Sequence, residues 1–385
     1  MKIGVVCYPT FGGSGVVATE LGKSMAQAGH QVHFITYEQP TRLDLLGENL
    51  YYHKVNIRNY PLFEFVPYES ALSSRMVHVV QSEKLDVLHV HYAIPHASAA
   101  FMAKQILKTM GIHIPVITTL HGTDITLVGK DDSFAPVVAF SINQSDAVTT
   151  VSESLKKDTF AHFNITNYID VIPNFIDLSR FRRQKKDHFK KAICPNNEKL
   201  LVHTSNFRKV KRIEDVVAIF AKVRKHLPSK LLLVGDGPER SPVESLCQEL
   251  GLAEDVRFIG KLEAIEEVLS IADVFLMPSE TESFGLAALE AMACEVPVIS
   301  SNTGGLPELN VNGVTGFLSN VGDIEDMFRN TLTVLDDKNL DTFRANALLR
   351  AKEFEVSLIR PMYEAVYRKA LAKIEKEILL ESVTV

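Results

Sequence analysis

The sequence contains no tryptophan and no long uninterrupted hydrophobic run, and its four cysteines are Cys7, Cys194, Cys247 and Cys294. The cysteines are far apart and form no C-x-x-C pair, so neither a zinc site nor a disulfide framework is indicated. No apolar run approaches the roughly 18 residues of a membrane-spanning helix, and the run at residues 3–8 is too short for a signal-peptide core. We therefore expect a protein of the reducing cytoplasm.

A strong excess of one charge is also missing. The chain carries 41 basic and 47 acidic residues, a formal charge of −6. This balance does not favour a broad surface for nucleic acid or anionic membranes, although local basic pockets stay open. With 385 residues and 46% hydrophobic side chains, the composition is that of an ordinary folded protein with two or three domains.

Short runs rich in valine and isoleucine alternate with helical patterns, which predicts parallel βαβ units. The first series of expected strands comprises residues 2–8, 32–37, 87–91, 116–120, 147–151 and 168–172. After a basic stretch at residues 180–191, a second series restarts with residues 200–204, 231–234, 256–259, 274–277 and 298–301. The restart predicts an α/β protein of two doubly wound domains, residues 1–171 and 172–360, with a ligand cleft between them. Residues 361–385 have the pattern of one amphipathic helix.

A glycine-rich loop joins the first expected strand to the first expected helix. Gly12, Gly13 and Gly15 let backbone N–H groups approach an anion at the start of that helix, and Gly13, Ser14 and Gly15 are candidates for binding a phosphorylated donor. The spacing to Ala18, with Glu38 twenty residues further on, also matches a dinucleotide fingerprint and keeps an NAD-dependent oxidoreductase open as an alternative. Extra residues before the first glycine weigh against that alternative, and a tight turn without a ligand is the other one.

The most specific pattern places a carboxylate at each end of a helix start, at Glu282 and Glu290. If the segment were wholly helical, the two backbones would lie about 12 Å apart, too far for a glycosidase pair but suited to the two ends of an elongated ligand. Alternatively, one of the two glutamates caps the helix and the other is solvated, and the pattern then needs no ligand. Backbone amides suited to a diphosphate lie between them, at Ser283, Phe284, Gly285 and Leu286.

Together these segments resemble the retaining glycosyltransferases of family 4, which have the two-domain GT-B fold. The likeness runs the length of the chain and includes the segments at 12–15, 88–91, 119–124, 171–174, 234–239 and 278–309. It implies a nucleotide-sugar in the interdomain cleft, bound mainly by the second domain, with the acceptor facing the first. It also implies that the helix at residues 361–385 packs back on the first domain, and that a homodimer is to be expected.

The resemblance assigns roles to individual residues. It implies that Glu290 binds the ribose, that Glu282 and His121 face the donor sugar, and that Lys211 neutralises the diphosphate. The family usually has an arginine five residues before the lysine, where this sequence has Asn206. Either of the neighbouring residues Arg208 and Lys209 could supply the positive charge that is missing at Asn206, or both are solvated loop charges.

Three segments resemble one subgroup of the family, namely T-F-G-G-S-G, the Asn206 loop and T-L-H-G-T-D-I-T-L-V-G. That subgroup transfers N-acetylglucosamine from UDP-GlcNAc to the hydroxyl of L-malate, the first step of bacillithiol biosynthesis. The resemblance makes Ser14, Tyr92, Thr119 and Asn206 candidates for binding the acceptor. Other family 4 acceptors, such as inositol phosphate, a lipid-linked sugar or a growing polysaccharide, stay open, as does a non-catalytic nucleotide-sugar-binding protein.

Two histidines, His89 and His91, alternate on an expected strand and so face the same way, as a metal pair would. No D-x-D motif accompanies them. Because Lys211 and a helix N-terminus already supply positive charge for a diphosphate, we expect neither a metal nor another cofactor.

Overall fold

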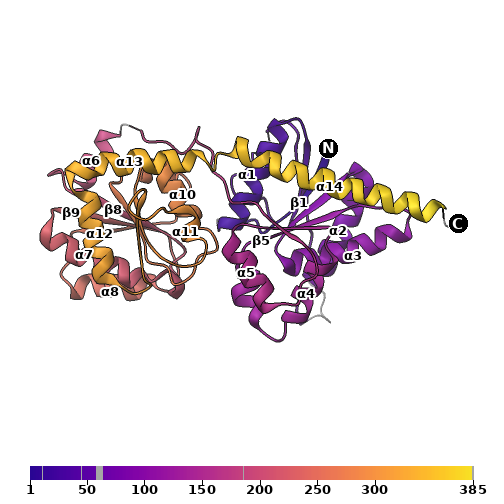
Figure 1. The fold of residues 1–385 in the computed structure, drawn as a ribbon, viewed down its shortest axis with the longest axis horizontal. Helices are drawn as coiled ribbons and strands as arrows, with labels where there is room; N and C mark the ends of the chain where they lie inside the picture. The colour runs from indigo at the N-terminus through magenta and orange to yellow at the C-terminus, as the bar shows by residue number, and fades with distance from the viewer. Residues whose placement is uncertain (11, 45, 58–63, 185, 384–385) are drawn as a thin grey trace. The chain divides into compact units, whose positions relative to one another are not determined.

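We describe the protein from a computed structural model, over residues 1–10, 12–44, 46–57, 64–184 and 186–383. The chain divides into two compact units (Figure 1). Unit 1 consists of Met1–Asn174 and Val356–Val385, and unit 2 of Phe175–Glu355. The sequence predicted the boundaries after residues 171 and 360. The two crossing segments meet in unit 2, where Ile176 N–H donates to the Phe354 carbonyl at 2.9 Å.

Unit 1 is built on a seven-stranded parallel sheet with the order β3-β2-β1-β4-β5-β6-β7. Its central strands are buried along their whole length, as expected for a parallel sheet covered on both faces, yet they contain histidine and threonine. The strands are β1 Lys2–Val6, β2 Gln31–Thr36, β3 Leu50–Lys54, β4 Val87–His91, β5 Val116–Leu120, β6 Ala147–Thr150 and β7 Ile169–Val171.

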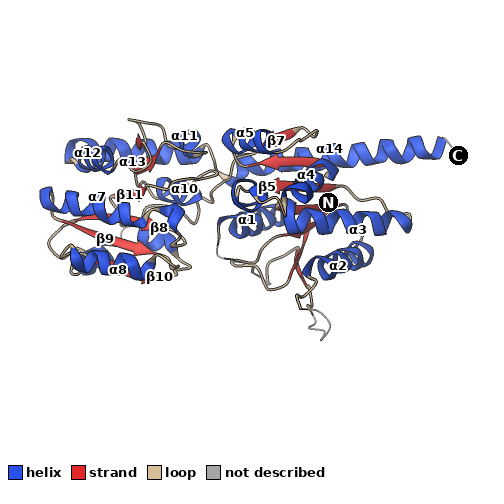
Figure 2. Cartoon of the chain, turned by 90° about the horizontal axis from the view of Figure 1, so that it is seen from below, coloured by secondary structure: helices blue, strands red, loops and turns tan. Residues whose placement is uncertain are grey.

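Helices pack on both faces of this sheet (Figure 2). One layer contains α2 Tyr68–Glu83, α3 Ser98–Thr109 and α4 Ala135–Gln144. The other contains α1 Gly13–Gln27 and the last helix, α14 Val356–Val383. The helix α5 Glu153–His162 packs against β6 and β7. Short helical turns η1 Ala93–Ala97, η2 Thr123–Leu127 and η3 Val128–Lys130 follow β4 and β5.

The helix predicted over residues 361–385 is α14, which begins five residues earlier. It packs on α1 and β5 of unit 1. Its Tyr363 and Tyr367 are among the largest fully buried side chains of the protein, so α14 is part of the unit 1 core.

Unit 2 has a six-stranded parallel sheet with the order β10-β9-β8-β11-β12-β13. The strands are β8 Lys199–Thr204, β9 Ser229–Val234, β10 Val256–Gly260, β11 Val274–Met277, β12 Val298–Ser301 and β13 Gly316–Ser319. The helices are α6 Asp187–Ile193, α7 Ile213–His226, α8 Arg240–Glu249, α9 Ile265–Leu269, α10 Leu286–Ala293, α11 Leu306–Leu309, α12 Ile324–Leu335 and α13 Asp337–Lys352, with the short turn η4 Lys209–Lys211.

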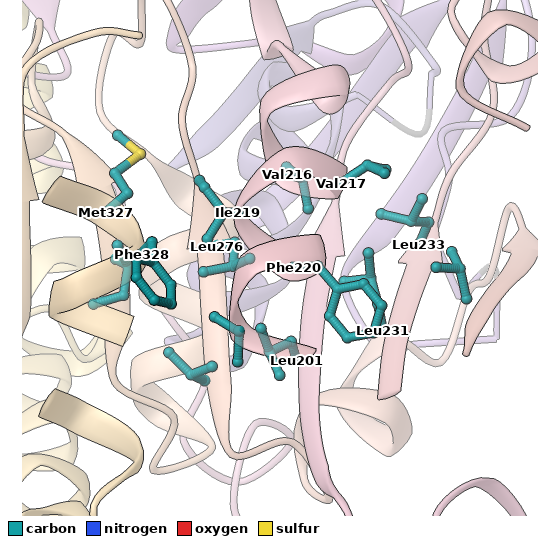
Figure 3. Packing of buried hydrophobic residues seen from close by; sticks show 14 of the residues in the cluster. Leu201, Val216, Val217, Ile219, Phe220, Leu231, Leu233, Leu276, Met327 and Phe328 are labelled. Atoms are coloured by element: carbon teal, nitrogen blue, oxygen red, sulfur yellow. The ribbon is translucent and has the colours of Figure 1, made fainter. Parts of the chain in front are cut away.

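The core of unit 2 lies between its sheet and the layer of α7, α8 and α12 (Figure 3). The apolar side of α7, with Val216 and Phe220, covers the strand residues Leu201 and Leu233. Burying each such side chain contributes about 1.5 to 3 kcal/mol. This packing holds the carboxyl ends of β8 and β11 in fixed positions.

Two edge strands were missing from the sequence prediction, β3 in unit 1 and β13 in unit 2. β3 is half exposed and contains two tyrosines, a histidine and a lysine among its five residues, so it has no buried apolar run. β13 is four residues long and begins with Gly316. Prediction from continuous apolar runs fails at such edges, where one side of the strand lacks a neighbour.

Candidate active site

Both sheets reverse their strand order once, between β1 and β4 in unit 1 and between β8 and β11 in unit 2. In open parallel sheets, ligands bind beyond the carboxyl ends of the strands at such a reversal. The loops that follow these four strands carry nearly all the predicted site residues. The structure therefore gathers them at one end of each sheet.

In unit 2 the predicted Lys211 and Glu282 are in direct contact. Lys211 Nζ lies 2.5 Å from Glu282 Oε1, and the Ser279 hydroxyl donates to the same oxygen at 3.0 Å. The two charged side chains are 24% and 11% exposed, so the pair is partly shielded from solvent but still open to a ligand. The loops after β8 and β11 thus place a cation and an anion side by side.

The start of α10 follows this pair. Gly285 has φ +98° and forms the N-cap, so the helix begins at Leu286 and the segment before it is a loop. The Phe284 ring is buried and packs edge-on against Phe354, with ring centroids 5.6 Å apart. Glu290 lies in α10 and is only 8% exposed. The two glutamates are therefore on different elements, a loop and a buried helix.

Two glycines after β12 support the Glu282 loop, and the sequence analysis gave them no role. Gly305 N–H donates to the Glu282 carbonyl at 2.9 Å. A Cβ atom on Gly304, whose φ is +55°, would lie 1.9 Å from that carbonyl oxygen, and one on Gly305 would lie 2.3 Å from the Ser283 carbonyl oxygen. The G-G-L-P-E-L signal is therefore explained by a backbone approach that leaves no space for side chains.

The loop after β8 is anchored by Phe207, which is fully buried and whose N–H donates to the Asp236 carbonyl at 3.0 Å. Asn206, Arg208 and Lys209 are all exposed on this loop. Within the described ranges neither Arg208 nor Lys209 forms an ion pair. The structure does not select one of them as the substitute for the family's arginine.

In unit 1 the glycine loop begins helix α1. Gly12 is the extended N-cap, and a Cβ atom on Gly15 would lie 2.5 Å from the Tyr8 carbonyl oxygen. Gly15 therefore lets the helix start pack directly on the preceding loop. Ser14 is partly exposed in the first turn. Phe11, part of the T-F-G-G-S-G motif, lies outside the described residues.

A cluster of histidines covers the ends of β4 and β5. His91 Nδ1 lies 2.8 Å from His121 Nε2. His89 bridges two elements, since its Nδ1 lies 2.8 Å from the Tyr367 hydroxyl and its Nε2 lies 2.7 Å from the Thr119 hydroxyl. The predicted His121 thus belongs to a buried network that extends to α14.

Burial keeps this cluster uncharged. It lowers the pKa of His89 and of His121 to about 3, and it lowers the pKa of His91 well below its usual value. It also lowers the pKa of His96 to about 4, although the bond to the His91 carbonyl acts the other way. The site in unit 1 therefore offers neutral imidazoles at physiological pH.

Asp124 is a site residue that the sequence analysis missed as such. Its carboxylate accepts from the N–H groups of Ala93, His121 and Gly122, at 3.0, 3.3 and 3.0 Å. Burial raises its pKa to about 6, although these hydrogen bonds act to lower it. Asp124 ties the loop after β4 to the loop after β5. The available signal was an aspartate three residues after His121 in the H-G-T-D segment.

The predicted acceptor residues Tyr92 and Thr119 differ in exposure. Tyr92 is partly exposed, has φ 85° and packs against the rings of Tyr8 and His121, with centroids 5.4 and 5.3 Å away. Thr119 is fully buried, and its hydroxyl is bonded to His89 and to Thr149. Contact with a ligand is therefore open to the Tyr92 side chain, whereas the Thr119 hydroxyl is used inside the sheet.

No set of three or more histidine, cysteine, aspartate or glutamate side chains that could hold a metal ion occurs in the described part of the chain. His89 and His91, which the sequence suggested as a metal pair, are hydrogen-bonded within unit 1 as described above. Among the described helices, none combines the length and the apolar character needed to cross a bilayer.

A cavity of about 520 Å³ lies at the opposite, amino-terminal end of the unit 2 sheet. Its centre is Asp273, 3% exposed, which bonds both Lys190 and Arg344 and also accepts from Leu200 N–H. Two cations thus share one carboxylate, and the cavity lies at the end of the sheet opposite to the loops that follow β8 and β11. We interpret it as a structural ion-pair network.

Comparisons with known proteins agree with this arrangement. The glycosyl transferases group 1 family model matches residues 184–349, and the Glycosyltransferase Family 4 model matches residues 11–180. The chain is 45% identical over 377 residues to N-acetyl-alpha-D-glucosaminyl L-malate synthase of Bacillus anthracis, covering 96% of this chain and 97% of that protein. It is 30% identical over 347 residues to an uncharacterized glycosyltransferase of Methanocaldococcus jannaschii, covering 84% and 87%.

Solved structures show the same fold. Sucrose-phosphate synthase from Thermosynechococcus elongatus has a TM-score of 0.79 at 22% identity, covering 97% of this chain and 99% of that chain. HepE from Anabaena, solved in complex with UDP-glucose, has a TM-score of 0.80 at 20% identity, covering 96% and 100%. The predicted two-domain GT-B fold is confirmed.

Proposed function

The chain belongs to glycosyltransferase family 4, and we propose that it transfers N-acetylglucosamine from UDP-GlcNAc to the hydroxyl of L-malate. The observation that carries the proposal is the near full-length identity of 45% to a malate synthase of this kind, together with the paired Lys211 and Glu282 at the strand reversal of unit 2. The NAD-dependent alternative has no support from these comparisons.

The donor is held by unit 2. The Lys211 ammonium contacts Glu282 in this structure and can exchange that partner for the diphosphate, which leaves the Glu282 carboxylate to accept from sugar hydroxyls. The amides of Ser283 to Leu286 meet the phosphates and the sugar, because the first turn of a helix has N–H groups without intrahelical partners. Glu290, buried on α10, accepts from the ribose hydroxyls.

The acceptor is held by unit 1. A dianionic hydroxy acid needs N–H and hydroxyl donors, and the side chains of Ser14 and Tyr92 supply hydroxyls for it. Asn206, exposed on the loop after β8, is a further candidate donor. Thr119 acts indirectly, because its buried hydroxyl is hydrogen-bonded to His89 and positions that ring.

The reaction retains the configuration of the anomeric carbon. The malate hydroxyl oxygen bonds to that carbon on the face from which UDP departs, the bond from carbon to the β-phosphate oxygen breaks, and the hydroxyl proton passes to that oxygen. Lys211 and the amides near Gly15 and Phe284 stabilise the charge that grows on UDP, a contribution larger in the transition state than in the ground state. The protein supplies positive charge without a metal or other cofactor in this proposal.

The test is a product assay. The protein is incubated with UDP-GlcNAc and a panel of L-malate, D-malate, succinate, inositols and phosphorylated sugars, and products are identified by mass and by the anomeric configuration of the sugar. We expect an α-linked N-acetylglucosaminyl malate, and none from succinate, which has the carboxylates but no hydroxyl. A product from another acceptor and none from L-malate would contradict the proposed acceptor and leave the family assignment standing.

A further inference from the structure

The contact between His91 and His121 indicates which ring nitrogen of each histidine carries the hydrogen. His121 Nε2 and His91 Nδ1 are 2.8 Å apart, and the ring centroids are 5.1 Å apart. A neutral imidazole has one N–H donor and one acceptor nitrogen. Because both rings are neutral, one of them donates in this bond and the other accepts, and the choice fixes which nitrogen of His121 faces a ligand.

The second nitrogen of His91 decides the choice. His91 is fully buried, and its Nε2 has no hydrogen-bond partner in the described part of the chain. A buried N–H without an acceptor is rarer in proteins than a buried acceptor without a donor. Nε2 is therefore the nitrogen without a proton, and Nδ1 carries the hydrogen that is donated to His121.

The neighbouring His96 shows the same pattern with no ambiguity. Its Nδ1 contacts the His91 carbonyl at 2.5 Å, and a carbonyl oxygen can only accept, so Nδ1 of His96 carries the proton. Its Nε2 is also buried without a partner among the described residues. In this cluster an unpartnered Nε2 thus occurs together with a donating Nδ1.

We propose that His91 is a positioning residue, which donates from Nδ1 to His121 Nε2 and so holds the proton of His121 on Nδ1. His121 Nδ1 has no hydrogen bond in the described residues, and it is not among the buried unpartnered atoms, so it is open to a ligand. His121 accordingly presents an N–H donor, for an oxygen atom of the sugar, and not a basic lone pair. The choice of ligand rests on the proposed function, whereas the position of the proton does not.

The direct test is NMR of protein labelled with ¹⁵N and ¹³C in histidine, in which correlations between ring nitrogens and ring carbon-bound protons distinguish Nδ1–H from Nε2–H. His121→Gln assigns the His121 signals by their loss. We expect the Nδ1–H form for His121 in the wild-type protein. The Nε2–H form would overturn the proposal. The readout needs no turnover, so it stands even where L-malate proves not to be the acceptor.

Two variants of similar shape add a kinetic test. His91→Asn keeps an N–H donor near the position of Nδ1, and His91→Leu removes it. We expect His91→Leu to lose the preference for Nδ1–H on His121 and to lower kcat/KM by about tenfold to hundredfold, as is common when the partner of a functional histidine is removed. His91→Asn should keep the Nδ1–H signal and restore most of kcat/KM. An unchanged His121 signal and unchanged kcat/KM in His91→Leu would overturn the proposal.

His33 provides a matched control. It is buried in β2, its Nδ1 lies 2.9 Å from His53 Nε2, and its own Nε2 has no partner within the described ranges. His33→Leu removes an equally buried histidine away from the site. It should lower the melting temperature much as His91→Leu does, while kcat/KM stays within about twofold of wild type.

Discussion

The two units have similar sheets, but they differ in the side chains that lie where the strand order of the sheet reverses. Unit 2 has a full ion pair between Lys211 and Glu282, on loops whose backbone is held by close glycine contacts. Unit 1 has uncharged histidines and threonines at the ends of buried strands, bonded side chain to side chain with one another and with Tyr367 of α14. The unit that is proposed to bind the diphosphate thus carries the mobile charge, and the other carries fixed neutral donors and acceptors.

The difference teaches how each site is stabilised. A partly shielded ion pair can change partners when a ligand arrives, because neither charge is deeply buried. A buried neutral network cannot rearrange without leaving polar atoms unpaired, at a cost of about 1 to 3 kcal/mol for each. Unit 2 is therefore suited to respond to a charged ligand, and unit 1 to present a rigid surface.

The largest expected effect comes from removing the charge of unit 2. Lys211→Ala should lower kcat by about 100-fold to 1,000-fold, because one preorganised stabiliser of transition-state charge is lost. The melting temperature should stay close to wild type, since the lysine is surface-accessible. Turnover with UDP-GlcNAc and L-malate and thermal unfolding would be measured together. Lys225→Ala, an exposed lysine of α7, is the control and should leave both unchanged. Near-normal turnover in Lys211→Ala would show that the Lys211 charge is not a functional difference between the two units.

A second variant tests whether the glycine backbone of unit 2 matters as much as its charge. Gly304→Ala should lower kcat/KM by about tenfold to hundredfold, because the new Cβ would lie 1.9 Å from the Glu282 carbonyl oxygen and would displace the loop. Gly313→Ala is matched to it, since Gly313 also has positive φ, +73°, but nothing lies within 4 Å of its Cβ position. If both variants lose the same activity, backbone strain alone explains the loss and the close approach does not.

A third expected effect, on stability and not on turnover, is a difference in acid stability between the units. Below pH 6.5 an unfolded histidine binds a proton that a buried one with a lowered pKa does not, so the free energy of unfolding falls as the pH falls. Between pH 6.5 and 4.5 this costs about 2 to 3 kcal/mol for each fully buried histidine, such as His89 or His96. In unit 2 the corresponding described histidine is His203, whose pKa burial lowers to about 4. Unit 1 should therefore unfold first on acidification.

Asp124 works in the opposite direction. Its pKa is raised to about 6, so between pH 6 and 4 the folded state binds more protons than the unfolded state, and protonation stabilises unit 1. This stabilisation offsets the loss of unfolding free energy that about one buried histidine causes. Asp124→Asn removes the offset and should make the acid loss of unit 1 steeper.

Because the natural chain has no tryptophan, each unit can report its own unfolding. Phe140→Trp in α4 and Phe317→Trp in β13 place one indole in unit 1 and one in unit 2. Fluorescence during acid titration should change at a higher pH in the first variant. Identical transitions would show that the two units do not differ in acid stability.

The sequence predicted unit 2 in more detail than unit 1. Lys211 and Glu282 lie in two short motifs whose residue types state their chemistry, and the structure brings them into contact. The roles of Gly304 and Gly305 were hidden, because a glycine that permits close packing looks like any turn glycine.

In unit 1 the informative pairs are separated by about one βα unit in sequence. His91 ends β4 and His121 directly follows the neighbouring β5, and the two strands pair with His91 opposite Thr119. Prediction along a single chain does not reveal which atoms of such residues meet, so Asp124 was missed and Thr119 was expected to be accessible. The family resemblance indicated His121, but only the fold shows its partner.

One consequence of the chain's path concerns the order of folding during synthesis. Unit 2 is complete once residue 355 has been made, whereas unit 1 still lacks α14. Until that helix arrives, His89 lacks the Tyr367 hydroxyl, and the surface that Tyr363 and Tyr367 later cover is open to water. On the ribosome the middle of the chain can therefore finish folding before the beginning, a reversal of the usual order from the N-terminus. Loss of the last 30 residues would leave a finished unit 2 attached to an unfinished unit 1.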